Sequence, residues 1–323
     1  MIKLILAAAL FSVVSAPAAG VVFDGKNGPG KGKHIVLISG DEEYRSEEAL
    51  PQLARILSTH HGFRCTVLFA IDPATGLVNP DYSSNIPGLE ALKSADLMVL
   101  FTRFRDLPDD QMQHIADYLD AGKPIVALRT ATHAFAPRKN LKWKNWHWQA
   151  PDGGFGRTIL GETWISHHGV HAKESTKALT APGKEKSDLL RGIASGDIWG
   201  PTDVYTVKLP AGDRDVLLLG QVLTGMSPSD PPLPGPKNEP MMPVAWTKPY
   251  KTESGKQGWA FTTTMGSSQD LQNEAFRRLL VNAVYQGAGL KVPGKAKVDI
   301  VGTYEPTQFK FGGYRKGMKP EQF

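Results

Sequence analysis

Short segments that are apolar along their whole length, separated by amphipathic helical patterns, constrain the fold of this chain most. Four such segments lie in the first half of the sequence: 34–40, 63–70, 95–101 and 124–128. Helical patterns at 47–60 and 106–121 each carry one apolar face, and Gly122 is expected to end the second helix. Strands without polar alternation are buried on both sides, which is typical of a parallel sheet covered by helices. The sequence therefore predicts an α/β fold with a mostly parallel central sheet.

The composition and the N-terminus predict how the chain is organised. With 323 residues, 41% of them hydrophobic, it can form one large domain. Residues 1–18 combine a lysine, an apolar run and an Ala-Pro-Ala site, so we expect a Sec-type signal peptide and a periplasmic or secreted protein. We expect a linker at 19–32, the domain at 33–290 and a C-terminal arm at 291–323. The single cysteine, Cys65, is interpreted as a buried strand residue.

The charge pattern narrows the classes of partner. The formal net charge of +5 is scattered along the chain and forms no basic stripe interleaved with aromatic residues. Nucleic-acid binding is therefore not expected. No segment after the signal peptide predicts membrane anchoring. The expected partner is a small molecule, and the sequence does not determine the oligomeric state.

Arg129 and His133 follow the fourth apolar segment, at the edge where parallel sheets bind their ligands. The planar guanidinium of Arg129 suits a carboxylate, a phosphate or a pair of sugar hydroxyls. The alternative is that Arg129 pairs with an acidic neighbour such as Asp41, Glu42 or Glu43 and braces the loops. If the turn opens a helix, His133 shares a face with Arg129 and can act as a general acid or base. The alternative for His133 is a hydrogen-bonded structural role.

The segment "GDEEYRSEE" follows the first apolar segment and contributes to the same edge. Glu43 is a candidate catalytic base, and we expect Asp41, Glu42 and Tyr44 to contact the ligand. The acidic residues could instead stabilise the start of the next helix, for which Ser46 is the candidate cap.

Residues 142–171 concentrate tryptophan and histidine in an irregular, glycine-rich stretch. The indole faces of Trp146, Trp148 and Trp164 are candidate platforms for the C–H face of a sugar. The alternative is that some of them close the core beneath a long loop.

The segment "HHGVH" is the strongest metal-like cluster in the sequence. On an extended chain His167 and His171 point to one side and His168 to the other. With His133 or His147 nearby, imidazoles could hold Zn²⁺, so a zinc site stays open as an alternative. Our favoured interpretation assigns no metal and no cofactor, and has these histidines bind a ligand or brace the loop.

Several segments agree in order and spacing with a known family. They are "LPDDQMQHIADYLDAGKPIVALRTATHAF", "LGETWISHHG", "PVAWTKPY" and "GWAFTTTMGSSQDLQNEAFRRLLVNAVYQGAG". Over about residues 33–290 the chain resembles the ThuA-like (trehalose-utilisation) family. That resemblance implies a flavodoxin-like three-layer sandwich, as in class I glutamine amidotransferases. The chain also departs from the family pattern at two positions. It has "ALR" in place of "GIH" at Arg129, and Ser267 in place of a histidine after Gly266.

The resemblance implies a carbohydrate-active enzyme of sugar catabolism, with 3-keto glycosides as candidate substrates. Arginine stays protonated and cannot attack a carbonyl, so Arg129 excludes the cysteine-dependent chemistry of the amidotransferases. We expect His133 or Glu43 to move protons, Arg129 to hold an oxyanion or hydroxyl pair, and His168 to orient the ligand. The enzyme class expected is a hydrolase or an isomerase or lyase. The competing hypothesis is a non-catalytic carbohydrate-binding module that retains the cleft.

Overall fold

The computed structural model describes residues 20–138, 141–208, 212 and 214–323. The strands are β1 (Gly20–Asp24), β2 (His34–Gly40), β3 (Arg64–Phe69), β4 (Leu97–Thr102), β5 (Ile125–Leu128), β6 (Ser166–His167), β7 (Thr176–Thr180), β8 (Ile198–Gly200), β9 (Tyr205–Thr206), β10 (Asp215–Val222), β11 (Met242–Lys251) and β12 (Gln257–Thr263). The α-helices are α1 (Ser46–His61), α2 (Asp109–Asp120) and α3 (Glu274–Gly287). Short helical turns are η1 (Leu89–Ser94), η2 (Arg129–His133), η3 (Leu141–Trp146), η4 (Gly156–Leu160), η5 (Asp188–Leu190), η6 (Asp270–Gln272) and η7 (Pro320–Gln322).

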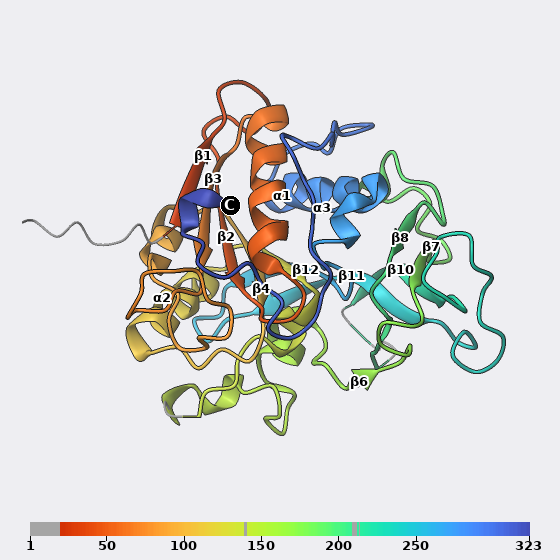
Figure 1. The fold of residues 1–323 in the computed structure, drawn as a ribbon, viewed down its shortest axis with the longest axis horizontal. Helices are drawn as coiled ribbons and strands as arrows, with labels where there is room; N and C mark the ends of the chain where they lie inside the picture. The colour runs from red at the N-terminus through yellow and green to blue at the C-terminus, as the bar shows by residue number, and fades with distance from the viewer. Residues whose placement is uncertain (1–19, 139–140, 209–211, 213) are drawn as a thin grey trace, which may run out of the picture.

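Ten of the described strands form one twisted sheet in the order β1-β3-β2-β4-β5-β12-β11-β10-β7-β8 (Figure 1). The centre, β3-β2-β4-β5-β12, is parallel and contains the four predicted apolar segments. The other half, from β12 to β8, is antiparallel. The predicted α/β class is confirmed, but the sheet is mixed rather than mostly parallel. The chain passes between β10, β11 and β12 through loops and a tight turn, and strands joined without a crossover helix pair antiparallel.

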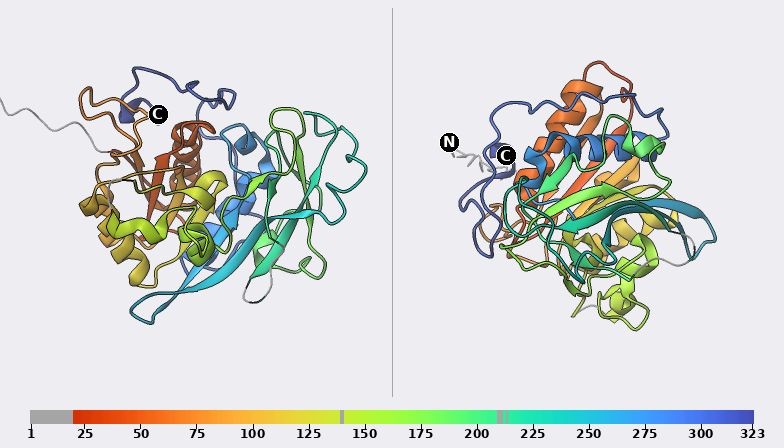
Figure 2. Two further views of the ribbon diagram at one scale, coloured as in Figure 1. Left: turned by 90° about the horizontal axis from the view of Figure 1, so that it is seen from below. Right: turned by 90° about the vertical axis from the view of Figure 1, so that its right-hand side faces the viewer.

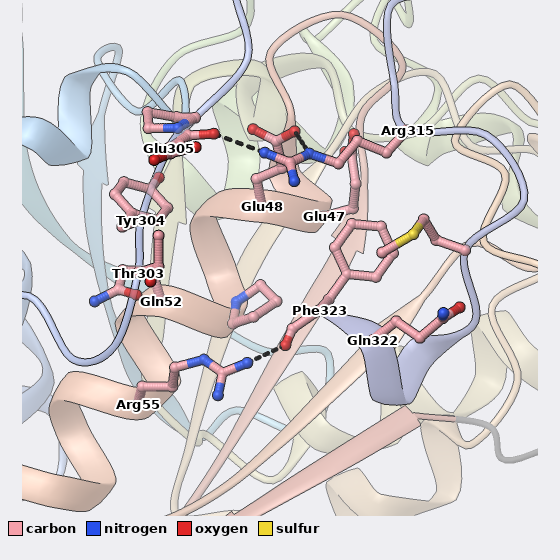
Figure 3. Close-up of a pocket in the computed structure, with 13 residues that line it drawn as sticks. Glu47, Glu48, Gln52, Arg55, Thr303, Tyr304, Glu305, Arg315, Gln322 and Phe323 are labelled. Carbon is pink, nitrogen blue, oxygen red and sulfur yellow. Dashed lines mark hydrogen bonds and ion pairs between the residues drawn. The ribbon is translucent and has the colours of Figure 1, made fainter.

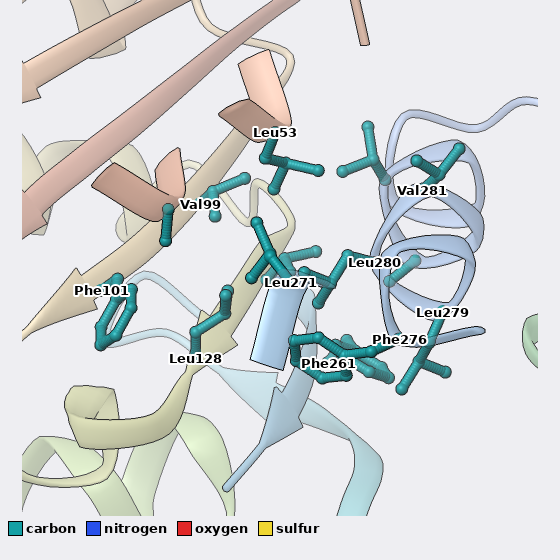
Figure 4. Packing of buried hydrophobic residues seen from close by; sticks show 14 of the residues in the cluster. Leu53, Val99, Phe101, Leu128, Phe261, Leu271, Phe276, Leu279, Leu280 and Val281 are labelled. Carbon is teal, nitrogen blue, oxygen red and sulfur yellow. The ribbon is translucent and has the colours of Figure 1, made fainter. Parts of the chain in front are cut away.

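Helices cover both faces of the parallel half, because successive strand residues point to opposite sides. On β4, Leu97 and Val99 pack with α1 and α3, while Met98 and Leu100 pack with α2 and η1. Figure 4 shows α3 residues such as Leu280 against the strands of the first cluster. Full burial of such a side chain contributes about 1.5–3 kcal/mol, so the two clusters fix the three-layer arrangement.

The helix boundaries follow local backbone chemistry. Pro108 is the N-cap of α2, so this helix starts three residues after the predicted Asp106. Gly122 adopts a φ of 74° just past the end of α2, as its role as a stop predicts. The Asn273 side chain accepts a hydrogen bond from the Phe276 N–H and caps α3.

Both ends of the described chain pack onto the domain. Residues 20–24 were expected to lie in a linker, but they form β1, which pairs antiparallel with β3 and covers the edge of the sheet. The arm from residue 291 runs across the outer side of α1 and α3 to η7 (Figures 1 and 2). It is tied by hydrogen bonds such as Val78 N–H to Met318 O (2.9 Å) and Lys310 N–H to Glu43 O (3.0 Å). The expected signal peptide lies outside the described residues. No helix within the described parts of the chain is both long and apolar enough to cross a membrane.

Candidate functional site

The turn after β5 holds Arg129 in the left-handed region, with a φ of 44°, and seals its side chain completely inside the protein. Nη1 donates to the carbonyl oxygens of Asp203 (2.6 Å) and Thr264 (2.7 Å). Nη2 donates to Asp203 Oδ1 (2.8 Å) and to the Tyr44 hydroxyl (3.1 Å). The guanidinium lies over the rings of Tyr205 (3.8 Å) and Tyr44 (4.5 Å). Both terminal nitrogens are therefore committed to the protein, and the predicted ligand-binding role of Arg129 is wrong.

His133 is also buried, and its ring lies 6.1 Å from that of Tyr205, on which Arg129 packs. The turn continues as the short helical segment η2 rather than as an α-helix, and the Arg129 guanidinium points to Asp203 instead. One ring nitrogen of His133 lies 3.1 Å from the Thr132 hydroxyl. Burial lowers the pKa of His133 well below its ordinary value, and the charges of Arg103 and Arg129 lower this pKa further. Burial thus favours the neutral form of the His133 ring, and its predicted role as an acid–base catalyst stays a prediction.

Asp203 lies at the centre of the polar cluster and was not identified from the sequence. Its carboxylate has no exposed surface and binds Arg129 through Oδ1. His167 Nδ1 lies 2.7 Å from Oδ2, and His171 Nδ1 lies 3.3 Å from Oδ1. Burial alone would raise the pKa of Asp203, but the charge of Arg129 and the two histidine hydrogen bonds outweigh burial and hold this pKa well below its ordinary value. Asp203 is therefore ionised and can only accept hydrogen bonds.

This ionised carboxylate determines which nitrogen of each histidine carries the proton. His167 and His171 must both donate from Nδ1, because Asp203 offers only acceptors. Their side chains are 38% and 34% exposed. When the rings are neutral, Nε2 keeps its lone pair on the side away from Asp203. The arrangement matches the histidine–aspartate half of a hydrolase triad, in which a buried carboxylate orients a general base.

Glu43 completes the cluster from the loop that follows β2. Its Oε1 lies 3.4 Å from His171 Nε2, and its Oε2 lies 3.6 Å from Arg103 Nη2. Burial raises the pKa of Glu43, against the opposing effect of Arg103. A protonated Glu43 can donate to His171 Nε2, so these two groups can share one proton. The structure thus brings Glu43, predicted as a catalytic residue, next to His171, which the sequence predicted to bind a ligand or brace the loop, with a metal site as the alternative.

The other residues of the loop after β2 have structural contacts. Asp41 is fully buried and accepts hydrogen bonds from the N–H groups of Glu43 (2.8 Å) and Tyr44 and from the Thr130 hydroxyl (2.5 Å). It holds the loop and cannot contact a ligand, which corrects that prediction. Tyr44 is buried in the stack with Arg129 and likewise offers no free face.

Glu42 forms ion pairs with Arg103 and with Arg105 (3.0 Å). It lines a cavity of about 220 Å³ whose other walls are Asp81, Ser83, Phe104, Arg105, Asp106 and Arg138. The cavity lies beyond the carboxyl ends of β2 and β4, at the edge where ligands of parallel sheets bind. Its walls are mainly polar, as a binding site for hydroxyl groups requires.

Aromatic side chains connect this cavity to the histidine pair. Ring centroids are 5.3 Å apart for Phe104 and Trp148, 5.6 Å for Trp148 and Trp164, and 5.8 Å for Trp164 and His167. Phe309 of the arm lies 5.2 Å from the His171 ring. Phe309 is buried, whereas Trp148 and Trp164 are partly exposed, and their role as stacking platforms for a sugar stays a prediction.

Trp146 and His168 lie elsewhere, contrary to prediction. Trp146 packs on Trp143 (5.3 Å) and Phe155 (5.3 Å) against the second hydrophobic cluster, so its contacts are those of the core. The His168 ring turns away from His167, and its Nε2 lies 2.8 Å from the Lys237 carbonyl oxygen. Side chains next to each other in an extended segment point to opposite sides, as the sequence indicated for this pair.

Within the described residues, one group of side chains is close enough to hold a divalent ion. It consists of His167, His171 and Asp203, whose potential metal-ligand atoms lie within 4.8 Å of one another. Two imidazoles and a carboxylate are ligands that Zn²⁺ accepts. However, Asp203 already balances Arg129, and its 2.7 Å contact with His167 Nδ1 is a direct hydrogen bond. An ion bound between these atoms would have to replace these hydrogen bonds. In this structure the three residues are joined by direct hydrogen bonds.

Comparisons with solved structures show which known proteins have a similar fold. No family model and no curated protein matches the chain. A ThuA-like protein from Parabacteroides merdae is similar in structure, with a TM-score of 0.51 and 14% sequence identity over 87% of this chain and 98% of that chain. A ThuA-like protein from Bacteroides uniformis has a TM-score of 0.48 and 14% sequence identity over 81% of this chain and 94% of that chain. The mmIFT52 N-terminal domain has a TM-score of 0.38 and 12% sequence identity over 79% of this chain and 97% of that chain. The chain has the fold of a ThuA-like protein, as the sequence resemblance predicted.

Proposed function

We propose that this protein is an enzyme of the ThuA-like family that acts on a carbohydrate by proton transfer, using His167 and Glu43. The observation that carries the proposal is Asp203, a buried and ionised carboxylate that orients two half-exposed histidines through Nδ1. A structural ion pair with Arg129 alone would not need these histidines. Their arrangement leaves a base at the surface and a negative charge behind it that stabilises the imidazolium formed in the reaction.

Glu43 supplies the acid for the same chemistry. Burial raises its pKa, so it keeps a proton at a higher pH than an exposed glutamate. In the proposed reaction His167 Nε2 removes a proton from the carbon next to a carbonyl group, and Glu43 donates its proton to the carbonyl oxygen. The product is an enediol. Returning a proton to the neighbouring carbon gives an isomer, whereas expelling a glycosidic oxygen together with a proton gives elimination, and later addition of water completes net hydrolysis.

The substrate class is supported by the surroundings of the cluster. Trp148, Trp164 and Phe104 provide aromatic faces between the histidines and the polar cavity. Sugars present both an apolar C–H face and a set of hydroxyl groups, so they fit such a combination. A 3-keto glycoside carries the carbonyl group that the proposed chemistry needs. The sequence resemblance implies the same substrate class.

The test is turnover of 3-keto glycosides and their parent glycosides in D₂O, followed by mass spectrometry. The wild-type chain is expected to exchange or transform the keto forms. His167→Gln is expected to lower the rate at least about 10²-fold, which is the usual contribution of a general base. His168→Gln is the matched control, because the His168 ring lies next to His167 in the chain but contacts the Lys237 carbonyl oxygen and not Asp203. Equal rates for wild type and His167→Gln would contradict the proposal, and metal analysis of the purified protein tests the zinc alternative.

A binding module is the second candidate. One observation favours it: Glu42 and Asp203 are both paired with arginines, as expected for a cleft that holds a ligand without reacting. In that case the chain would bind the glycosides without changing them. His167→Gln would then alter only the dissociation constant, measured by calorimetry, and no deuterium would enter the sugar.

A further inference from the structure

The C-terminal arm passes directly beside the polar cluster at residues 309–313. Phe309 is buried, and its ring centroid lies 5.2 Å from that of His171. The Lys310 N–H then donates to the carbonyl oxygen of Glu43 (3.0 Å). A segment from the end of the sequence therefore forms part of the surroundings of the proposed reaction centre.

Residues 310–313 form a tight turn that is fixed on the domain. The Gly313 N–H donates to the Lys310 carbonyl oxygen (3.4 Å), and the same oxygen accepts a hydrogen bond from the guanidinium of the buried Arg45. Gly312 has a φ of 62°, and a positive φ at the third residue of a turn favours glycine. Gly313 packs so closely on Arg45 that a Cβ atom at this position would clash with the guanidinium.

The arm is also attached to α1 on both sides of this turn. Before the turn, the N–H and the hydroxyl of Thr307 donate to the Glu48 carboxylate (2.8 Å each). After the turn, Arg315 Nε donates to the same carboxylate (3.0 Å), as the dashed line in Figure 3 marks. The turn is therefore held at a defined place beside the site by contacts at both of its ends.

Phe311 occupies the exposed corner of this turn. Its side chain is 62% exposed, although it is a large apolar ring. The ring lies 4.9 Å from Arg103 Cζ, and the same guanidinium lies 4.5 Å from the Phe104 ring. Arg103 Nη2 is in turn 3.6 Å from Glu43 Oε2. Phe311 thus lies next to the acid of the proposed reaction, and the larger part of its side chain is open to solvent.

The site therefore has an aromatic face at each end. Contacts run from Phe311 through Arg103 and Glu43 to the histidine pair, whose ring centroids are 5.1 Å apart. They continue from His167 to Trp164 (5.8 Å). A monosaccharide that stacks on the tryptophan side would leave the exposed ring of Phe311 uncovered.

We propose that Phe311 is the stacking platform for a second ring of the substrate, so that the enzyme acts on a glycoside whose aglycone is itself a ring. This inference rests on the proposed function. The reacting sugar would lie on the side of Trp164 and His167, and the aglycone would pack on Phe311, with Glu43 between them. Both an aromatic ring and the C–H face of a sugar pack well on an exposed benzene ring.

The experiment is isothermal titration calorimetry with three 3-keto compounds: methyl β-D-glucoside, phenyl β-D-glucoside and cellobiose, the last oxidised at its non-reducing ring. The full chain carries His167→Gln to prevent turnover during the titration. We expect at least one of the two compounds with a second ring to bind at least about fivefold more tightly than the methyl glucoside, which is the size of a ring-stacking contact. The tighter of the two shows whether the aglycone is aromatic or a sugar.

Three variants in the same background separate the ring from other effects. Phe311→Ala should abolish the preference for a second ring and leave the affinity for the methyl glucoside unchanged, whereas Phe311→Tyr keeps the ring and should retain the preference. Val22→Ala is the matched control, because it removes exposed apolar surface from the edge strand β1 and should change neither affinity.

Two results would overturn this inference and leave the proposed function standing. The first is equal affinity for the methyl glucoside and both larger compounds when Phe311 is present. The second is an equal loss of affinity for all three compounds in Phe311→Ala, which would mean that the ring only covers Arg103. Absence of binding for all three compounds, together with absence of turnover in the wild type, would instead refute the proposed function and this site with it.

Discussion

Replacing Asp203 by asparagine tests the buried cluster most directly. Asparagine has the same shape, so the packing around Arg129, Tyr44 and Tyr205 is retained. The change removes the negative charge that lies 2.8 Å from Arg129 Nη2, where both side chains have no exposed surface. Arg129 is fully buried and stays protonated at any working pH, as arginine does in proteins. The variant therefore keeps an uncompensated positive charge inside the protein.

The expected loss is large compared with the stability of a domain. Removing one partner of a buried ion pair costs about 3–5 kcal/mol, while a typical domain unfolds with about 5–15 kcal/mol. Arg129→Met should cost a similar amount, because it also leaves the carbonyl oxygens of Asp203 and Thr264 without their donor. The double variant removes both charges. It should be more stable than the sum of the single changes predicts, by about 3 kcal/mol.

Urea unfolding at pH 7, followed by circular dichroism, gives the free energies for this cycle. Asp215→Asn is the matched control, because its ion pair with Lys184 is exposed and surface pairs contribute about 0–1 kcal/mol. The pKa of Asp203 is lowered in the folded state, so its contribution is present above the ordinary aspartate pKa of 3.8 and disappears as the pH falls below it. A loss under 1 kcal/mol in Asp203→Asn, or single changes that simply add, would refute a buried pair.

Three further predictions use other parts of the molecule. Burial raises the pKa of Glu47 from 4.5 to about 8. The wild type should therefore lose up to about 5 kcal/mol of its free energy of unfolding as the pH rises between these values, at about 1.4 kcal/mol per pH unit. The free energy of unfolding of Glu47→Gln should not show this slope, and parallel curves for the two proteins would contradict the prediction. Cys65 is fully buried and burial raises its pKa, so DTNB should label it only after unfolding; rapid labelling of the native protein would show the burial to be wrong. Trp146→Ala should lower the free energy of unfolding by about 2 kcal/mol or more through lost core contacts, and Trp148→Ala should mainly weaken glycoside binding, so equal effects of both changes on the dissociation constant would argue against the site.

The edge of the sheet that carries the site was predictable, but the partners within it were not. Parallel strands direct their carboxyl ends to one edge, which brings Glu43, Arg103 and Arg129 together from separate segments. The choice between a ligand and a structural partner for Arg129 depended on a carboxylate 74 residues away along the chain. Asp203 sits in "GPTDVY", where no spacing or motif marks it. The sequence indicated that a buried arginine needs a carboxylate partner, but it pointed to the neighbouring Asp41, Glu42 or Glu43 rather than to Asp203.

The tryptophans show the same limit. Trp146 and Trp148 are two residues apart and were assigned the same role. The structure packs Trp146 into the core with Phe155, and leaves Trp148 against Phe104 near the polar cavity. An indole suits both environments, because it is a large apolar surface with one polar atom. Only the path of the loop decides which surface each ring meets.

The sequence by itself determined the α/β class, the four central strands, the helices that cover them and the absence of a nucleophilic cysteine at the turn after β5. These features depend on local periodicity and on the side-chain chemistry of single residues, both of which can be read without coordinates. The tertiary structure alone decided that Arg129 closes on Asp203, that Asp203 orients His167 and His171, and that the carboxyl group of Glu47 is fully buried. Those contacts join segments far apart in the chain, and their electrostatics depend on burial, which exists only once the sheet, the loops and the arm have packed together.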